Sequence, residues 1–325
     1  MAQQLASKEE LHQYLDPHVL EKIKRLDLRA RHVVEGFISG LHRSPFQGFS
    51  VEFATHREYV PGDDIKHIDW KVQARTDRIY IKQYEEETNL KSTFLVDGSE
   101  SMRFRMPDSD TMTKFDYAAT CAAALAYMLQ QQQDAVGLAT FDEGLMEYIP
   151  PSNSPTQLKR MVHALSTTEQ RKKTELAPVC HRLAEKMARR GMVCLVTDLF
   201  VDDVEETILA LEHFRHAGHE VMLLHIMDDA ELTFPFQSVT LFRGLEEMGE
   251  ETVEPKALRD AYLEEVNTFL HEVKRRCAAA RIDYRLVNTS EHLDAVLSSF
   301  LAARMAAARK MVAKRYPSWL GPFAG

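Results

Sequence analysis

The sequence predicts an α/β protein with a doubly wound, mostly parallel sheet, preceded by a small β-rich module and a leading helix. Two observations favour this class. From residue 91 onward, short apolar runs alternate with longer segments of helical periodicity, as in a parallel sheet covered by helices on both faces. Between residues 46 and 86, apolar and polar residues alternate instead, which is typical of half-buried strands.

The leading helix is predicted over residues 17–35, because Asp16 suits the N-cap and Pro17 the first helical turn. Its apolar stripe is Leu20, Ile23, Leu26, Ala30 and Val33. In the β-rich module, alternating residues around 49–53 and 79–84 indicate strands, and Pro61-Gly62-Asp63-Asp64 indicates a turn between them.

The remaining elements follow in alternation. Strands are predicted at 92–97, 135–141, 145–149, 192–197, 220–227 and 282–287. Helices are predicted at 113–132, 155–165, 175–190, 203–217, 255–280 and 290–313. The acidic stretch 228–254 is interpreted as an insertion before the long helix, either an ordinary solvated loop or, as the alternative, a segment that borders the metal face. The predicted organisation is a helical segment (1–45), the β-rich module (46–90), the α/β domain (91–315) and a tail (316–325).

Charge and hydropathy exclude several classes of function. The net charge of the 325-residue chain is −9, whereas a nucleic-acid binder needs a basic face. The first ten residues lack the features of a secretory signal, and no apolar run approaches the roughly 20 residues that span a bilayer. We therefore expect a cytoplasmic protein without a membrane span. The four cysteines show no metal-binding spacing and are interpreted as reduced core thiols.

A candidate metal site follows the first predicted strand of the α/β domain. Asp97, Ser99 and Ser101 stand two residues apart at the end of an apolar run. Taken alone, this pattern also fits an ordinary Asp/Ser-rich turn. Their oxygen atoms are, however, the kind of ligand that Mg2+ prefers.

Two further residues favour the metal interpretation. Thr174 stands just before a predicted helix, and Asp198 follows a second buried strand. If both strands belong to one parallel sheet, their carboxyl ends open on the same crevice, where open α/β folds bind ligands. Oxygen donors from three loops would then converge.

The pattern Asp97, Ser99, Ser101, Thr174 and Asp198 resembles the metal-ion-dependent adhesion site of von Willebrand factor A domains. The block from Arg57 to Arg75 resembles the signature of the bacterial "domain of unknown function 58" proteins, which carry such a domain. One departure concerns the positions next to Thr174 and Asp198, where many A domains have Gly and this chain has Lys173 and Leu199.

The resemblance implies a von Willebrand factor A-like sheet and a bound divalent cation, Mg2+ first, with Mn2+ or Ca2+ as alternatives. Ser99 and Ser101 would be inner ligands and Thr174 a conditional ligand, while Asp97 and Asp198 would supply charge and orient water. It also implies association with a MoxR-type AAA+ ATPase. The expected function is a non-enzymatic adaptor or co-chaperone that captures a carboxylate of a client protein through the cation.

An enzyme is the alternative. Asp97 could serve as the nucleophile of a Mg-dependent phosphoryl transferase or phosphatase. Position 99 is Ser, however, so the second acid that would act as general acid two residues later is missing.

The signature block has two interpretations. Its charged residues could form bidentate ion pairs that lock the β-rich module around Trp70. They could instead form a docking surface, since Arg and Trp are favoured at interaction hot spots. The residues concerned are Arg57, Asp63, Asp64, Asp69, Trp70 and Arg75.

Overall fold

The computed structural model describes residues 25–41, 56–58, 80–82, 90–107, 109–170, 174–187, 190–201, 203–245 and 249–303. The chain divides into two compact units: Gly40–Thr88 forms one, and Met1–Ser39 with Asn89–Gly325 forms the other. Within the smaller unit, β1 (His56–Glu58) pairs antiparallel with β2 (Tyr80–Lys82).

The larger unit contains a six-stranded sheet in the order β10-β7-β6-β3-β4-β5. All neighbouring strands are parallel except β4 and β5. The strands are β3 (Lys91–Asp97), β4 (Ala135–Phe141), β5 (Leu145–Ser152), β6 (Gly191–Thr197), β7 (His219–Met227) and β10 (Asp283–Asn288). In chain order, β3 is first and lies centrally, with the next two strands on one side and the last three on the other. This is the doubly wound topology, and it confirms the predicted fold class.

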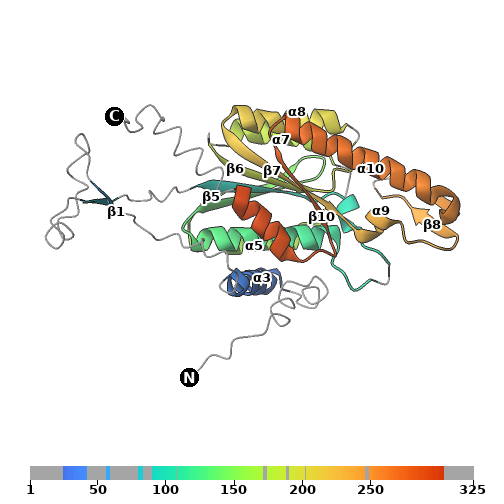
Figure 1. The fold of residues 1–325 in the computed structure, drawn as a ribbon, viewed down its shortest axis with the longest axis horizontal. Coiled ribbons are helices and arrows are strands. Elements are labelled where there is room, and N and C mark those ends of the chain that lie inside the picture. Colours follow the sequence, from blue (N-terminus) through green and yellow to red (C-terminus); the bar gives the residue numbers. More distant parts are fainter. Residues whose placement is uncertain are drawn as a thin grey trace, which may run out of the picture. The chain divides into compact units, whose positions relative to one another are not determined.

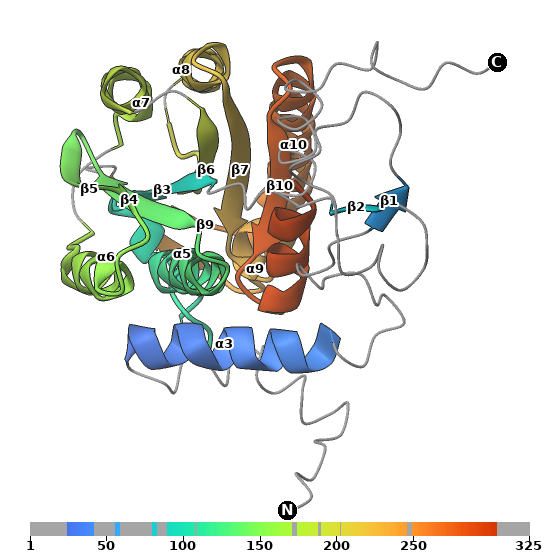
Figure 2. The same ribbon diagram turned by 90° about the vertical axis from the view of Figure 1, so that its left-hand side faces the viewer.

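Helices cover both faces of this sheet (Figures 1 and 2). They are α5 (Lys114–Gln131), α6 (Gln157–Thr167), α7 (Leu176–Lys186), α8 (Val204–His216) and α10 (Pro255–Ala279), with the short helices η2 (Ser101–Arg103) and α9 (Asp229–Thr233). Residues 293–303 are also helical. Among the described residues, no helix combines the length and the apolar character needed to cross a lipid bilayer.

Successive residues of β3 face opposite layers. Leu95 lies in the core cluster that α7, α8 and α10 close, whereas the ring of Phe94 stacks on Phe300 of the helical segment on the other face. Both side chains are fully buried. This burial on two faces explains why central parallel strands such as β6 appear in the sequence as continuous apolar runs.

The leading helix was predicted with the wrong bounds. The described helix, α3 (Leu26–Leu41), continues six residues past the predicted end, because buried Phe37 extends the apolar stripe of Ala30 and Val33. α3 lies against the α5 layer (Figure 2), where Arg29 contacts the sulfur of Met112 at 3.2 Å. Residues 17–24 of the predicted helix lie outside the described residues.

The prediction of a loop over 228–254 was wrong. This segment forms α9 and an antiparallel hairpin of β8 (Thr240–Arg243) and β9 (Glu250–Val253). Asp228 and Glu231 form a capping box at the start of α9. Aromatic rings then hold the hairpin against α10, with the Phe234 centroid 4.6 Å from that of Tyr262 and 5.9 Å from that of Phe242. These contacts between aromatic rings join α9, the hairpin and α10.

Gly191 allows β6 and β3 to approach closely. A side chain at this position therefore tests how the two strands pack. A Cβ atom at position 191 would lie 2.5 Å from the backbone oxygen of Lys91. Gly191→Ala is expected to destabilise the protein by at least about 2 kcal/mol, which lowers the Tm by about 4–8 °C. Gly144→Ala is the control, since its nearest neighbour is the flexible end of Arg182 at 3.7 Å. Equal melting temperatures for the two variants in calorimetry would contradict the strand packing.

Candidate metal centre

The candidate site lies where the strand order of the sheet reverses. Asp97 is the last residue of β3, and Asp198 directly follows β6. These two strands are parallel neighbours, with Val96 opposite Val196. In open α/β sheets the loops at such a switch point diverge and leave a crevice for ligands. The topology therefore brings the two aspartates together, as the sequence predicts.

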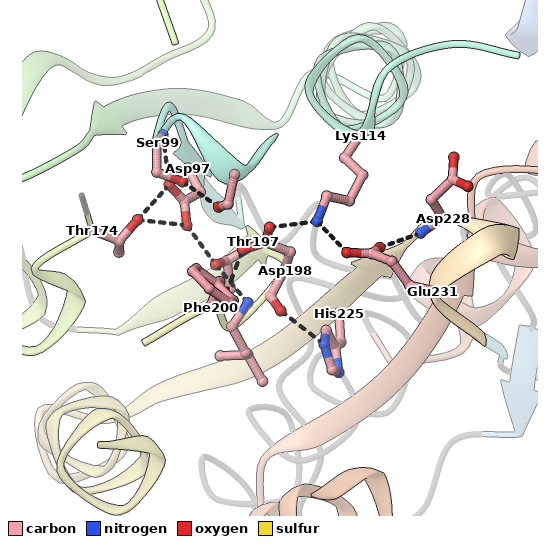
Figure 3. A network of polar contacts seen from close by, with 12 residues as sticks. Asp97, Ser99, Lys114, Thr174, Thr197, Asp198, Phe200, His225, Asp228 and Glu231 are labelled. Carbon is pink, nitrogen blue, oxygen red and sulfur yellow. Dashed lines mark hydrogen bonds and ion pairs between the residues drawn. The ribbon is translucent and has the colours of Figure 1, made fainter. Parts of the chain in front are cut away.

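Asp97 is the buried centre of a hydrogen-bond network (Figure 3). Its carboxylate accepts hydrogen bonds from the Ser99 backbone N–H at 2.9 Å, the Thr174 hydroxyl at 3.1 Å and the Thr197 hydroxyl at 2.6 Å. The side chain is completely buried. Burial, and next the negative charge of Asp198, raise the pKa of Asp97 to about 7, although the hydrogen bonds from Thr197 and Ser99 oppose this rise.

The two serines complete the link between the aspartates. The hydroxyl oxygens of Ser99 and Ser101 lie 3.0 Å apart, and the Ser101 hydroxyl also hydrogen-bonds the Asp198 carboxylate. Both serines are buried. Thr174 is held nearby because the next residue, Glu175, donates its backbone N–H to the Asp142 carbonyl oxygen at 3.1 Å. The structure thus gathers all five predicted site residues: Asp97, Ser99, Ser101, Thr174 and Asp198.

Lys114, the first residue of α5, contributes a buried positive charge that the sequence analysis missed. Its ammonium lies 2.7 Å from Oδ2 of Asp198 and 2.9 Å from Oε1 of Glu231, and only 3% of its side chain is exposed. Burial alone would raise the pKa of Asp198, but the charge and hydrogen bond of Lys114 outweigh it and lower that pKa. Asp198 is therefore ionised and already paired with a cation from its own chain.

The backbone after β6 takes a conformation that L-residues rarely adopt. Leu199 has φ +53°, although its side chain is buried in the core. Its backbone N–H donates to the Thr197 hydroxyl at 3.1 Å, and the next N–H, of Phe200, donates to the Asp198 carboxylate at 3.1 Å. The loop therefore keeps a left-handed residue that is not glycine, and these two hydrogen bonds hold the turn in place.

His225 supports Asp198 from β7. Its Nε2 atom lies 3.0 Å from the Asp198 carbonyl oxygen and its Nδ1 atom 2.9 Å from the Tyr284 hydroxyl. Burial lowers the pKa of His225 to about 4, more strongly than the nearby Asp198 charge raises it. The imidazole is thus neutral at physiological pH and acts as a hydrogen-bonding support.

The donor set suits a hard divalent cation. It consists of hydroxyl and carboxylate oxygens, and Mg2+ prefers such ligands. Asp97, when ionised, and Asp198 add negative charge to this set, while the Lys114 ammonium pairs with Asp198 and Glu231. Within the described ranges, no group of three or more His, Cys, Asp or Glu residues could by itself hold a metal ion. A cation would therefore depend on the hydroxyls of Ser99, Ser101 and Thr174.

Most of the signature block, Arg57 to Arg75, lies outside the described residues. Arg57 lies in β1, opposite Ile81 of β2. Asp63, Asp64, Asp69, Trp70 and Arg75 lie outside the described residues. Both interpretations of this block, structural ion pairs and a docking surface, therefore stay predictions.

Comparison with known proteins gives a family match over most of the chain. Residues 55–271 match the family described as "Protein of unknown function DUF58". Uncharacterized proteins of Mycobacterium tuberculosis and Mycobacterium bovis are each 24% identical over 296 residues, which covers 89% of this chain and 90% of theirs.

Solved structures with a similar arrangement include the conserved hypothetical protein BatB from Bacteroides thetaiotaomicron, with a TM-score of 0.45, 14% identity, and 68% of this chain and 99% of that chain covered. A von Willebrand factor type A protein from Catenulispora acidiphila has a TM-score of 0.37 and 11% identity, with coverage of 68% and 42%. The SpRpn10 VWA domain has a TM-score of 0.34 and 12% identity, with coverage of 64% and 93%.

Proposed function

The chain belongs to the protein family of unknown function DUF58, and from the geometry of its site we propose that it is a non-enzymatic adaptor that binds a divalent cation. The cation, Mg2+ first and Mn2+ or Ca2+ as alternatives, would be held by Ser99, Ser101 and Thr174, with Asp97 and Asp198 supplying charge. A coordination position left open would accept a carboxylate of a partner protein. The observation that carries the proposal is the convergence of these hydroxyls and carboxylates at the switch point of the sheet.

The chemistry of the donors supports binding of a partner's carboxylate rather than catalysis. Three of the five donors are neutral hydroxyls, so the bound ion would keep much of its positive charge and attract an outside carboxylate. Phe200, two residues after Asp198, is 45% exposed. An exposed aromatic side chain next to a charged site is a favourable anchor for a protein partner.

The arrangement weighs against Asp97 as a nucleophile for phosphoryl transfer. Its side chain is completely buried, and the hydroxyls of Thr174 and Thr197 contact both of its oxygen atoms. A nucleophilic carboxylate has to reach its substrate within van der Waals distance. These bonds favour the role of an internal charge that orients the loops.

The Lys114 ammonium occupies the position beside Asp198 that a metal ion would need. It neutralises Asp198 from inside the protein, and Ser99 and Ser101 are buried. We assign this arrangement to the closed form of the adaptor. In the proposed open form, Lys114 keeps its partner Glu231 and the divalent ion takes over Asp198.

A MoxR-type AAA+ ATPase is the proposed partner, together with a client that carries an exposed Asp or Glu. The test is a pull-down with the purified full chain and the ATPase of the native host, with Mg2+, with EDTA, and with Asp97→Ala in Mg2+. We expect recovery to fall at least about tenfold in the last two conditions, because the bridging ion is lost. Asp260→Ala is the control, since Asp260 is an exposed carboxylate of α10 outside the network. Equal recovery in all conditions would refute the metal bridge.

A further inference from the structure

A pair of histidine rings faces one another on the surface formed by α7 and α8. The Nδ1 atoms of His181 and His213 lie 2.8 Å apart, their ring centroids lie 4.3 Å apart, and the ring planes are inclined by 52°. His213 is exposed and His181 is partly exposed. Two imidazole nitrogens this close share either a proton or a cation, because their lone pairs otherwise repel each other.

The two rings border an open hollow of about 610 Å³. Its lining consists of His181, Ala184, Glu185, His213, His216 and Ala217. Glu185 lies one helical turn after His181, and His216 one turn after His213, so each helix presents a second polar side chain on the same face. The small side chains of Ala184 and Ala217 leave the space between these groups open.

We propose that His181 and His213 form a binding site for a transition-metal ion of the Zn2+ class, with one Nδ1 ligand from each helix. Imidazole suits Zn2+, Ni2+ and Cu2+, whereas Mg2+ prefers oxygen. With Zn–N distances of 2.0–2.1 Å, a tetrahedral ion places two nitrogens about 3.3–3.4 Å apart. The rings therefore need to separate by only about half an ångström from their present 2.8 Å.

Water completes the coordination shell in this proposal. Among the residues that the structure describes, no third His, Cys, Asp or Glu already stands in position to form a metal site with the pair. The hollow is open to solvent and has room for bound water. The four cysteines, Cys121, Cys180, Cys194 and Cys277, are buried and do not compete for the ion.

The site joins α7 and α8, the two helices that follow the loops of the candidate metal centre. α7 begins two residues after Thr174, and α8 follows the loop that starts at Asp198. The helices contact one another and lie side by side in Figure 2. A metal ion between His181 and His213 would cross-link them, so its binding stabilises the folded chain.

The test uses the full chain stripped of metal with a chelator and then dialysed. Zn2+ is titrated by calorimetry in millimolar Mg2+, and thermal unfolding is followed with and without Zn2+. We expect binding in the micromolar range, a rise in Tm of several degrees, and at least about a tenfold loss of affinity in both His181→Ala and His213→Ala. Far-UV circular dichroism verifies that these surface variants are folded.

Control variants separate this site from other sources of zinc binding. His163→Ala and His271→Ala remove exposed histidines on other helices and are expected to leave the Zn2+ affinity unchanged. Asp97→Ala is also expected to bind Zn2+ normally, which would distinguish this site from the proposed Mg2+ centre. Unchanged Zn2+ affinity in His181→Ala and His213→Ala, or an equal loss in the His163 control, would overturn the proposal.

Discussion

Lys114→Met is expected to lower the free energy of unfolding by about 3–5 kcal/mol, although methionine nearly preserves the length of the side chain. The substitution removes the only ammonium within hydrogen-bonding distance of Asp198 and Glu231 in the described part of the chain. Two carboxylates then stay in a buried environment without their counter-charge. Urea unfolding of the full chain, followed by fluorescence and circular dichroism, measures the loss.

Three further variants, Lys114→Arg, Glu231→Gln and the double variant Lys114→Met/Glu231→Gln, identify the cause of that loss. Lys114→Arg keeps the charge and should be destabilised less than Lys114→Met. The double variant Lys114→Met/Glu231→Gln removes one unpaired charge and should recover part of the stability, which gives a coupling energy for the pair. If the two Lys114 variants lose the same free energy, the effect comes from packing and the electrostatic account fails.

The effect of Mg2+ on the Tm of Lys114→Met is a second, independent measurement. If the closed form of the site is held by the Lys114 ammonium, removing it leaves Asp198 and Glu231 without their counter-charge. The proposed Mg2+ centre should then bind more tightly, and Mg2+ should raise the Tm of Lys114→Met more than that of the unmodified chain. An equal or smaller rise would show that Lys114 does not compete with the metal.

The four central strands β3, β4, β6 and β7 were predictable because they are buried on both faces. Runs such as Val193–Val196 have to be apolar throughout, and they end where polar residues begin at Thr197 and Asp198. Once two such runs are placed side by side in a parallel sheet, the proximity of Asp97 and Asp198 follows from the strand order. This reasoning needs no contact between distant side chains.

The charge network behind the site was not predictable in this way. Lys114 resembles any lysine at the start of a helix, and Glu231 lies in a segment whose secondary structure was predicted wrongly. Their meeting at Asp198 depends on how α5 and α9 pack, which is a tertiary property. Thr197 was missed for a different reason: it is the last residue of a buried strand, and only the 2.6 Å bond to Asp97 shows its role.

Asp97 is expected to couple metal binding to proton release. Burial and the Asp198 charge raise its pKa to about 7, so a large fraction of the metal-free protein carries a protonated Asp97 at neutral pH. Mg2+ requires the ionised form, and binding must therefore displace the proton. The Mg2+ affinity should fall by up to about tenfold for each pH unit below 7.

Calorimetric titration with Mg2+ between pH 5.5 and 7.5 tests this coupling. Repeating it in buffers with different ionisation enthalpies counts the protons released, which should approach one per ion below pH 7. Asp97→Asn keeps the shape but cannot ionise, so it should bind Mg2+ much more weakly and without this pH dependence. His225 does not interfere, because burial lowers its pKa to about 4 and keeps it neutral throughout this range.

The raised pKa of Asp97 has the opposite effect on the stability of the metal-free chain, which should fall as the pH rises. A carboxyl group whose pKa is raised by folding favours the folded state at low pH, and this contribution is lost as the pH rises from about 4 to about 7. Relative to Asp97→Asn, the unmodified chain should therefore lose stability across that range without Mg2+. Saturating Mg2+ should remove the loss near pH 7, because the ion replaces the proton as the partner of Asp97. If the Mg2+ affinity is independent of pH while Asp97→Asn binds equally well, Asp97 is a structural hydrogen-bond acceptor and the cation lies elsewhere.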